Sequence, residues 1–460
     1  MSNFWDFSVW GTINLAGSLI VSMLVANMIK RSIPILKNSL IPTSVLGGLL
    51  LLVISIIYET STGVPFFDTA VFGGKGLATL EVITYHSLAL GFIASAFKPA
   101  KGKMTKQRTT EIFNTGVTTV ATYLIQAIVG FGITIIASFI IKDFFQAAGV
   151  LLPFGYGQGT GQALNYGTIY ETEFGFDGGK SFGLTVAAVG FLVASIGGVI
   201  HLNIVQKRFN IKERHSDTGD VMSMSDIQGE NEIPMAGSLD KVSIQMAFIM
   251  GAYLLTYVSM YGLSALIPGF RSILYGFNFL FGVLIATVMS IVVGALHKRN
   301  IVHRQYINTF LMTRISGFFF DLMIVAGIAA IRIQRLEAFV GVLVILCVAG
   351  SVVTYFYIRL VCRKLFPAYQ EEQFLGMFGM LTGTASTGII LLREVDRNLQ
   401  SPVSDNMVYQ NLPAIVFGFP MMLLATMAPV KPYLTFGILV VFFIAMNIIL
   451  FRSLIFKKRK

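Results

Sequence analysis

Charged residues are scarce in this chain. Asp, Glu, Lys and Arg make up 12% of its 460 residues, whereas soluble domains usually contain about 25%. Hydrophobic residues make up 55%, and the mean hydropathy is +0.74. A chain long enough for several domains, with half the usual charge density, is typical of a protein whose main solvent is lipid. The composition therefore favours an integral membrane protein.

Cysteine is almost absent, and a cleavable signal peptide is not evident. The two cysteines, Cys347 and Cys362, lie near the ends of one apolar segment and do not support a disulfide framework. The first apolar run lacks a basic leader and a small-residue cleavage site, so we expect it to span the membrane. The net charge of +11 comes from Lys and Arg clusters between apolar runs, which does not indicate a nucleic-acid partner.

Eleven apolar runs are candidate membrane spans, since about 20 residues are needed to cross the hydrocarbon core. They are residues 8–29, 41–57, 82–97, 114–141, 181–204, 243–267, 272–296, 308–330, 338–361, 411–428 and 433–456. Two further apolar segments, 147–170 and 374–392, are interrupted by glycine and hydroxyl residues. In the first, the uninterrupted run Ala147–Phe154 is far too short to span the membrane.

Basic clusters predict the orientation, because cytoplasmic loops carry an excess of Lys and Arg. The clusters contain Lys30, Arg31 and Lys37; Lys98, Lys101, Lys103, Lys106 and Arg108; Lys207, Arg208, Lys212 and Arg214; Lys298, Arg299 and Arg304; Arg363 and Lys364; and Lys457–Lys460. They share one face only if the N-terminus is outside, the C-terminus is cytoplasmic, and residues 147–170 enter and return to the same face. We therefore predict a re-entrant segment there, and interpret residues 374–392 in the same way.

This topology contains an internal symmetry. Residues 1–204 give five spans with a broken segment between the fourth and fifth, and residues 243–428 give the same pattern in the opposite orientation. We predict an all-α integral membrane fold of about 11 transmembrane helices, with two inverted five-helix repeats that each contain a re-entrant hairpin. A polar cytoplasmic linker, 205–242, joins the repeats. Residues 429–460 add a C-terminal span and a basic tail outside the repeat.

The two broken segments are the candidate binding site. Unwound backbone survives in hydrocarbon only where protein or a water-filled cavity surrounds it. Free N–H groups at the start of a half-helix favour a carboxylate, and free carbonyls favour Na⁺. The candidate substrate- and ion-binding residues are Gln158, Gly159, Thr160, Gly161, Gln162, Asn165, Gly383, Thr384, Ser386 and Thr387. The alternative is that these small residues only allow close helix packing.

Three stretches in this order resemble the bacterial sodium/glutamate symporter family, over roughly residues 1–428. The family's Ile-Pro-x-x-Val-x-Gly-Gly motif is matched by Ile41-Pro42-Thr43-Ser44-Val45-Leu46-Gly47-Gly48. Its first hairpin is matched by Gly157–Gly161, followed by Glu171 and Gly175-Phe176. The next helix is matched by Gly190–Val193 with Gly197-Gly198. The resemblance implies two inverted five-span halves with paired hairpins. It also implies sodium-coupled import of glutamate across the bacterial inner membrane, without a cofactor other than Na⁺ at the hairpins, and analogy suggests a homodimer.

Departures from the family pattern leave the substrate open. Gln158 replaces the family's histidine, Ser386 stands where proline is usual, and Leu391 lies near a usual asparagine. A sodium- or proton-coupled carrier of another small organic anion or amino acid is the main alternative. An intramembrane enzyme or a receptor is disfavoured, because the sequence has no His-Glu-x-x-His or Gly-x-Ser-x-Gly motif and no loop longer than about 38 residues.

Several other polar residues interrupt the apolar runs. Asp321 lies two helical turns from Arg314, and we leave open a structural ion pair, a role in cation coupling, or a water-facing position. His201 is at the end of a span and is interpreted as interfacial. Gln126 and Asn278 are isolated amides in mid-span, where an amide more often bridges helices than binds substrate.

Overall fold

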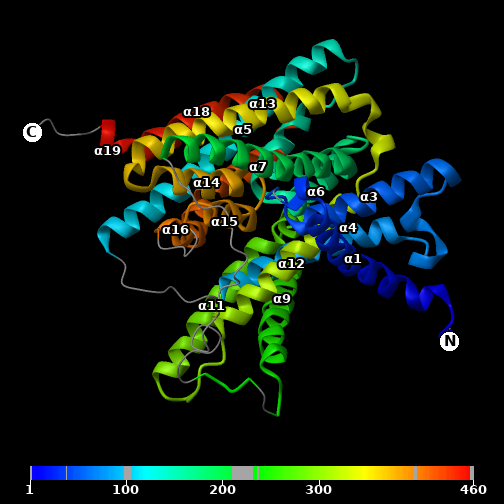
Figure 1. Ribbon diagram of the computed structural model, residues 1–460, viewed down its shortest axis with the longest axis horizontal. Coiled ribbons are helices and arrows are strands. Elements are labelled where there is room, and N and C mark those ends of the chain that lie inside the picture. Colours follow the sequence, from blue (N-terminus) through cyan, green and yellow to red (C-terminus); the bar gives the residue numbers. More distant parts are fainter. Residues whose placement is uncertain are drawn as a thin grey trace, which may run out of the picture. The chain divides into compact units, whose positions relative to one another are not determined.

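The computed structural model describes residues 3–37, 39–97, 105–209, 232–235, 238–396 and 401–455 (Figure 1). Every regular element of more than one residue within these ranges is a helix. Most of the predicted linker 205–242 lies outside the described residues, and so do Lys98, Lys101, Lys103, Lys212, Arg214 and Lys457–Lys460 of the basic clusters.

Ten long helices in the described part of the chain are apolar enough to cross a membrane. They are α1 (Phe7–Ser32), α3 (Thr43–Thr62), α4 (Gly76–Ala96), α5 (Lys106–Ile140), α7 (Gly179–Phe209), α9 (Lys241–Leu266), α11 (Asn278–Lys298), α12 (Thr309–Ala329), α13 (Val340–Leu365) and α18 (Pro432–Leu450). An eleventh candidate is α16 (Val403–Tyr409) with α17 (Asn411–Met427), which are bent by 51°. The prediction of a multi-pass helical membrane protein is confirmed.

The remaining helices are short or broken. They are α2 (Pro34–Lys37), α6 (Leu151–Phe174), α10 (Arg271–Gly276), α14 (Gln370–Thr382), α15 (Ala385–Arg393), α19 (Arg452–Ile455), and the 3₁₀ turns η1 (Phe66–Asp68), η2 (Ala70–Phe72), η3 (Gln146–Val150), η4 (Pro268–Phe270), η5 (Ile333–Phe339) and η6 (Pro367–Tyr369). Each of the eleven predicted spans coincides with a helix. The predicted span 272–296 begins later, because α10 is a separate turn before α11.

Local sequence explains where α3 and α5 begin or end. The Thr105 side chain accepts a hydrogen bond from the Arg108 N–H at 3.2 Å and caps the N-terminus of α5. Helix α3 follows Pro42, which lacks an N–H, and ends at Gly63 with φ +72°, a left-handed conformation that favours glycine.

The chain divides into two compact units, and each combines segments from both halves of the sequence. The larger unit contains residues 1–82, 103–213 and 324–460, and the smaller unit contains residues 83–102 and 214–323. In the smaller unit, Ile93, Ala252, Ala286 and Met312 pack into one hydrophobic core.

Three polar residues in apolar helices of the smaller unit have different surroundings. The Asn278 side chain donates to the Tyr85 carbonyl at 3.5 Å, so the prediction that Asn278 bridges helices is confirmed. Asp321 is half-buried. The Arg314 guanidinium lies over the Phe310 ring, 5.1 Å from its centroid.

In the larger unit, α5 runs beside α13 and α18 (Figure 1). The Arg452 guanidinium donates to Asn114 Oδ1 at 2.9 Å, and the Tyr357 hydroxyl donates to Asn447 Oδ1 at 2.8 Å. The first bond joins α19, which directly follows α18, to α5, and the second joins α18 to α13. The C-terminal helix is therefore an integral part of the larger unit, although its sequence lies outside the predicted repeats.

His201, which the sequence places at a span end, is surrounded by protein, with 2% of its side chain exposed. Its ring nitrogens pair with the Tyr355 hydroxyl at 2.8 Å and with Glu371 Oε2 at 3.0 Å. The Arg359 guanidinium donates to both Glu371 oxygens at 2.6 Å. This buried charge cluster (His201, Tyr355, Arg359 and Glu371) joins α7, α13 and α14. Sequence alone places the histidine at a span end but cannot show that α14 covers it.

Candidate functional site

Helix α6 is broken in its middle. Gly159 has φ +73° and ψ −168°, a backbone conformation that is essentially restricted to glycine. The rings of Phe154 and Tyr166, on either side of this break, stack with their centroids 3.9 Å apart. Residues before and after Gly159 therefore lie beside each other.

Helices α14 and α15 form a tight hairpin with its tip at Gly383. Thr384 caps the N-terminus of α15, since its hydroxyl accepts the Thr387 N–H at 3.4 Å. A Cβ atom built on Gly379 would lie 2.7 Å from Gly388 Cα, so the two backbones are in direct contact. The glycines of this segment thus make the close approach of the two helices possible.

Both breaks reach α7 at the same residue. A Cβ atom on Gly190 would lie 2.4 Å from the Thr382 carbonyl oxygen and 2.9 Å from the Tyr156 ring. Helices α6 and α14 also contact each other. We call this meeting point the junction: Tyr156, Gly157 and Gly159 of α6, Leu381, Thr382 and Gly383 at the end of α14, and Gly190 of α7.

Helix α5 hydrogen-bonds to corresponding carbonyls of both breaks. The Tyr123 hydroxyl donates to the Gly157 carbonyl at 3.0 Å, and Gln126 Nε2 donates to the Leu381 carbonyl at 2.9 Å. Each acceptor lies two residues before the glycine that breaks its helix. Carbonyls at helix ends lack intrahelical partners, so two side chains one turn apart on α5 satisfy them.

Helix α13 supports the junction from another side. The Tyr156 hydroxyl lies 2.8 Å from the Cys347 carbonyl and 3.1 Å from Ser351 Oγ. Gln126 Nε2 also donates to Thr354 Oγ1 at 2.9 Å. The three α13 residues are spaced four and three apart and share one helical face. Gln126 thus bridges α5, α13 and α14, as predicted for a mid-span amide.

Most of the predicted site residues are buried near the junction. Exposures are 0% for Thr160, 1% for Gln162, 9% for Asn165 and 0% for Thr387. Gly159, Gly161 and Gly383 are buried, Gln158 and Thr384 are half-buried, and Ser386 is exposed. Asn165 Nδ2 donates to Gln162 Oε1 at 3.2 Å. Thr160 lies against Gly327 of α12, where an added Cβ would be 2.5 Å from Thr160 Cβ.

Four buried amide atoms of the larger unit have no hydrogen-bond partner among the described residues. They are Gln162 Nε2, Gln126 Oε1, Asn406 Oδ1 and Gln410 Oε1. An unsatisfied buried polar atom costs about 1–3 kcal/mol. Each is therefore a place where water, an ion or a substrate group can bind. The unpaired donor belongs to α6, and the three unpaired oxygens flank α14.

The junction offers neutral ligands. Its oxygens come from backbone carbonyls and from the hydroxyls of Tyr156 and Thr382, and neutral oxygens suit hard cations. Within the described ranges, no group of three or more His, Cys, Asp or Glu could hold a metal ion. The junction can therefore present N–H groups to an anion and neutral oxygens to a cation.

The residues that sequence reasoning missed are those that support the breaks. Tyr123 carries no signal in an apolar run, because a tyrosine there is usually a core residue.

The fold and the junction define a polytopic helical membrane protein with a buried polar site. No protein-family model matches the chain, and no curated protein matches it. Its function is therefore inferred from the chemistry of the junction and from the motifs of the sequence.

Proposed function

We propose that this protein is a sodium-coupled secondary transporter that imports glutamate across the bacterial cytoplasmic membrane. The observation that carries the proposal is the meeting of two broken helical segments at Gly190. Helix breaks inside a membrane protein are tolerated where they are surrounded by protein or line a cavity. In secondary transporters such breaks form the substrate and ion sites.

The two segments offer complementary charges. The half-helix that begins at Thr160 presents its N–H groups and the positive end of its dipole, and the buried Gln162 amide adds an unpaired donor. These groups favour a carboxylate. Helix α14 ends at the junction and presents the negative end of its dipole, which favours Na⁺.

In this proposal the two halves of the chain are inverted repeats, and residues 147–170 and 374–392 are re-entrant from opposite faces. The N-terminus is outside, the C-terminus is cytoplasmic, and two copies form a homodimer. The site at the junction is then reached alternately from each side.

Electrical work argues for more than one cation. Bringing one negative charge inward costs about 2.3 kcal/mol per 100 mV of inside-negative potential. Accumulation of a glutamate anion therefore requires at least two co-transported cations for net positive charge movement. The alternative substrate is another small organic anion or amino acid, since Gln158 departs from the family's histidine.

The proposal is tested by radiolabelled glutamate uptake into proteoliposomes, with and without an inward Na⁺ gradient. We expect uptake that requires Na⁺ and is blocked by unlabelled glutamate. Uptake of another carboxylate or amino acid in place of glutamate would support the alternative. Failure of any gradient to drive uptake of these solutes would reject the transporter proposal.

Replacing Thr160 or Thr387 with valine is expected to weaken uptake, because both hydroxyls are buried beside the breaks. Valine keeps the volume and removes the oxygen, so a loss of about tenfold is expected, equal to about 1.4 kcal/mol. The control is Thr435→Val, which removes a buried hydroxyl from α18. Wild-type uptake by both site variants contradicts the assignment.

A further inference from the structure

Three unpaired oxygens follow α14 along its length. Asn406 lies against Gln373, Gln410 against Met380, and Gln126 against Leu381. Gln373 and Leu381 are eight residues apart, about 12 Å along the helix. We call this set, with the facing side of α5, the oxygen seam: Asn406, Gln410, Gln126 and Thr115.

Hydrogen bonds fix the orientation of the Asn406 amide. The Thr115 hydroxyl donates to the Glu111 carbonyl at 2.8 Å, so it accepts from Gln373 Nε2 at 3.2 Å. Gln373 Oε1 is then the acceptor for Asn406 Nδ2 at 3.5 Å. The unpaired atom of Asn406 is therefore its oxygen.

The other two amides have the same polarity. Gln126 Nε2 faces the Leu381 carbonyl, which can only accept, so Gln126 Oε1 is the unpaired atom. Gln410 Nε2 lies 3.2 Å from Asn411 Oδ1 and 3.7 Å from Met380 Sδ, which leaves its oxygen unpaired. The buried hydroxyls of Thr118 and Thr122 on α5 donate to carbonyls of their own helix. Their oxygens thus keep free acceptor capacity.

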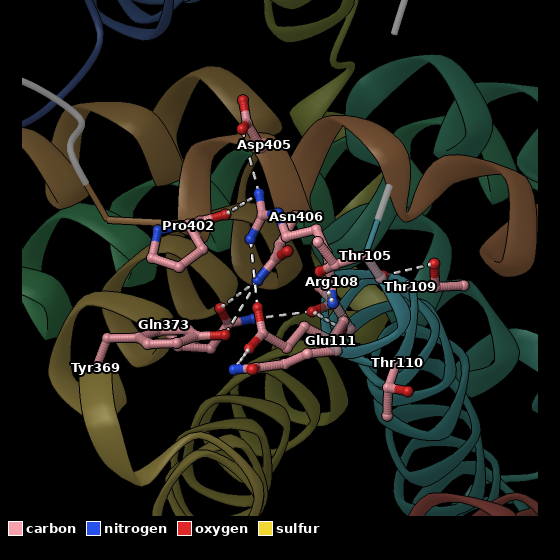
Figure 2. A network of polar contacts seen from close by, with 12 residues as sticks. Thr105, Arg108, Thr109, Thr110, Glu111, Tyr369, Gln373, Pro402, Asp405 and Asn406 are labelled. Carbon is pink, nitrogen blue, oxygen red and sulfur yellow. Dashed lines mark hydrogen bonds and ion pairs between the residues drawn. The ribbon is translucent and has the colours of Figure 1, made fainter. Parts of the chain in front are cut away.

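Carboxylates lie at one end of the seam (Figure 2). The Arg108 guanidinium pairs with Glu111 at 3.3 Å and with Asp405 at 3.2 Å, and donates to the Pro402 carbonyl at 3.1 Å. Tyr369, Gln373 and Asn406 lie beside this group in Figure 2. Two carboxylates thus share the Arg108 guanidinium at this end of the seam.

We propose that the oxygen seam binds the coupling cation on its route between Glu111 and Asp405 and the junction. The identity of this cation as Na⁺ rests on the proposed function. Buried acceptors without donors attract a cation and disfavour an anion. Two carboxylates, Glu111 and Asp405, lie at one end of the seam, and the other end is the C-terminus of α14, where the helix dipole is negative. The seam therefore serves the cation, and the N–H groups of α6 serve the carboxylate.

The test compares Asn406→Leu and Gln410→Leu with the wild type in reconstituted vesicles. Each variant is expected to raise the Na⁺ concentration for half-maximal uptake by about tenfold, equal to about 1.4 kcal/mol. The substrate concentration for half-maximal uptake at saturating Na⁺ is expected to stay within about twofold. Asn447→Leu is the matched control, because Asn447 Oδ1 is already paired with the Tyr357 hydroxyl and is therefore not an unpaired acceptor.

Two further measurements test cation binding at the oxygen seam separately from the proposed transport of glutamate. Gln410→Glu adds a negative charge and is expected to lower the half-maximal Na⁺ concentration. Na⁺, compared with K⁺, is expected to raise the melting temperature of the purified wild-type protein, and less so in the leucine variants. Unchanged Na⁺ dependence in folded leucine variants overturns the seam. If they do not fold, an unchanged or raised Na⁺ requirement in Gln410→Glu overturns it. Wild-type uptake that ignores Na⁺ rejects the proposed function; the melting comparison then tests the seam independently.

Discussion

Replacing Gly190 with alanine is expected to abolish uptake while leaving the helical fold in place. The added Cβ would lie 2.4 Å from the Thr382 carbonyl oxygen, and a backbone atom cannot turn aside as a side chain can. Overpacking of this kind costs about 1–3 kcal/mol. The strain is relieved only if the tip of α14 moves away from α7, which opens the junction. We expect uptake to fall at least about tenfold, the effect of losing about 1.4 kcal/mol.

The matched control is Gly437→Ala in α18, where an added Cβ meets no atom within 4 Å. Both variants make the same substitution inside a helix, so intrinsic helix propensity favours alanine equally in each. Initial uptake rates are compared at equal amounts of reconstituted protein, and circular dichroism checks helix content. Wild-type uptake by Gly190→Ala would show that the close approach of the two breaks is irrelevant to transport.

Replacing Glu371 with glutamine is expected to cause a large loss of stability. Glu371 and Arg359 each have only 12% of the side chain exposed, and the carboxylate accepts from Arg359 and His201. Burial alone would raise the pKa of the Glu371 carboxyl, but the hydrogen bonds from Arg359 and His201 outweigh it and lower the pKa. Removing one partner leaves a buried guanidinium without its counter-charge, which costs about 3–5 kcal/mol.

The measurement is the melting temperature of the purified protein in detergent. Arg359→Met combined with Glu371→Met removes both charges, and is expected to recover most of the loss because no buried charge is left unpaired. Equal melting temperatures for Glu371→Gln and the wild type would show that the cluster does not stabilise the fold. A double variant less stable than Glu371→Gln would contradict the explanation.

The sequence predicted the helices and both breaks well, because these depend on local properties. Apolar runs of sufficient length gave the spans, and glycine-rich interruptions gave the breaks at Gly159 and Gly383. The positive φ of Gly159 is a direct consequence of having no Cβ atom. Inverted symmetry and re-entrant topology stay predictions, since they describe the chain relative to a membrane.

The partners of the breaks could not be predicted from sequence. Tyr123 and Gln126 reach carbonyls 34 and 255 residues away along the chain, and no local pattern encodes such pairs. The same limit applies to His201, which pairs with Glu371, 170 residues later in the chain. It also explains why the predicted additional span 433–456 proved to be hydrogen-bonded to α5 through α19 and to α13 through α18.

The interleaving of the two units has a consequence for biosynthesis. Helix α5 is synthesised early, yet its polar face can contact Thr354, Gln373 and Leu381 only when these residues of the last third of the chain have been made. Chains emerge at about 5–20 residues per second. The threonines and glutamine of α5 therefore wait on the order of ten seconds or more for their final neighbours. During that interval the polar side chains of this helix need other hydrogen-bond partners, such as water, lipid headgroups or an insertion chaperone.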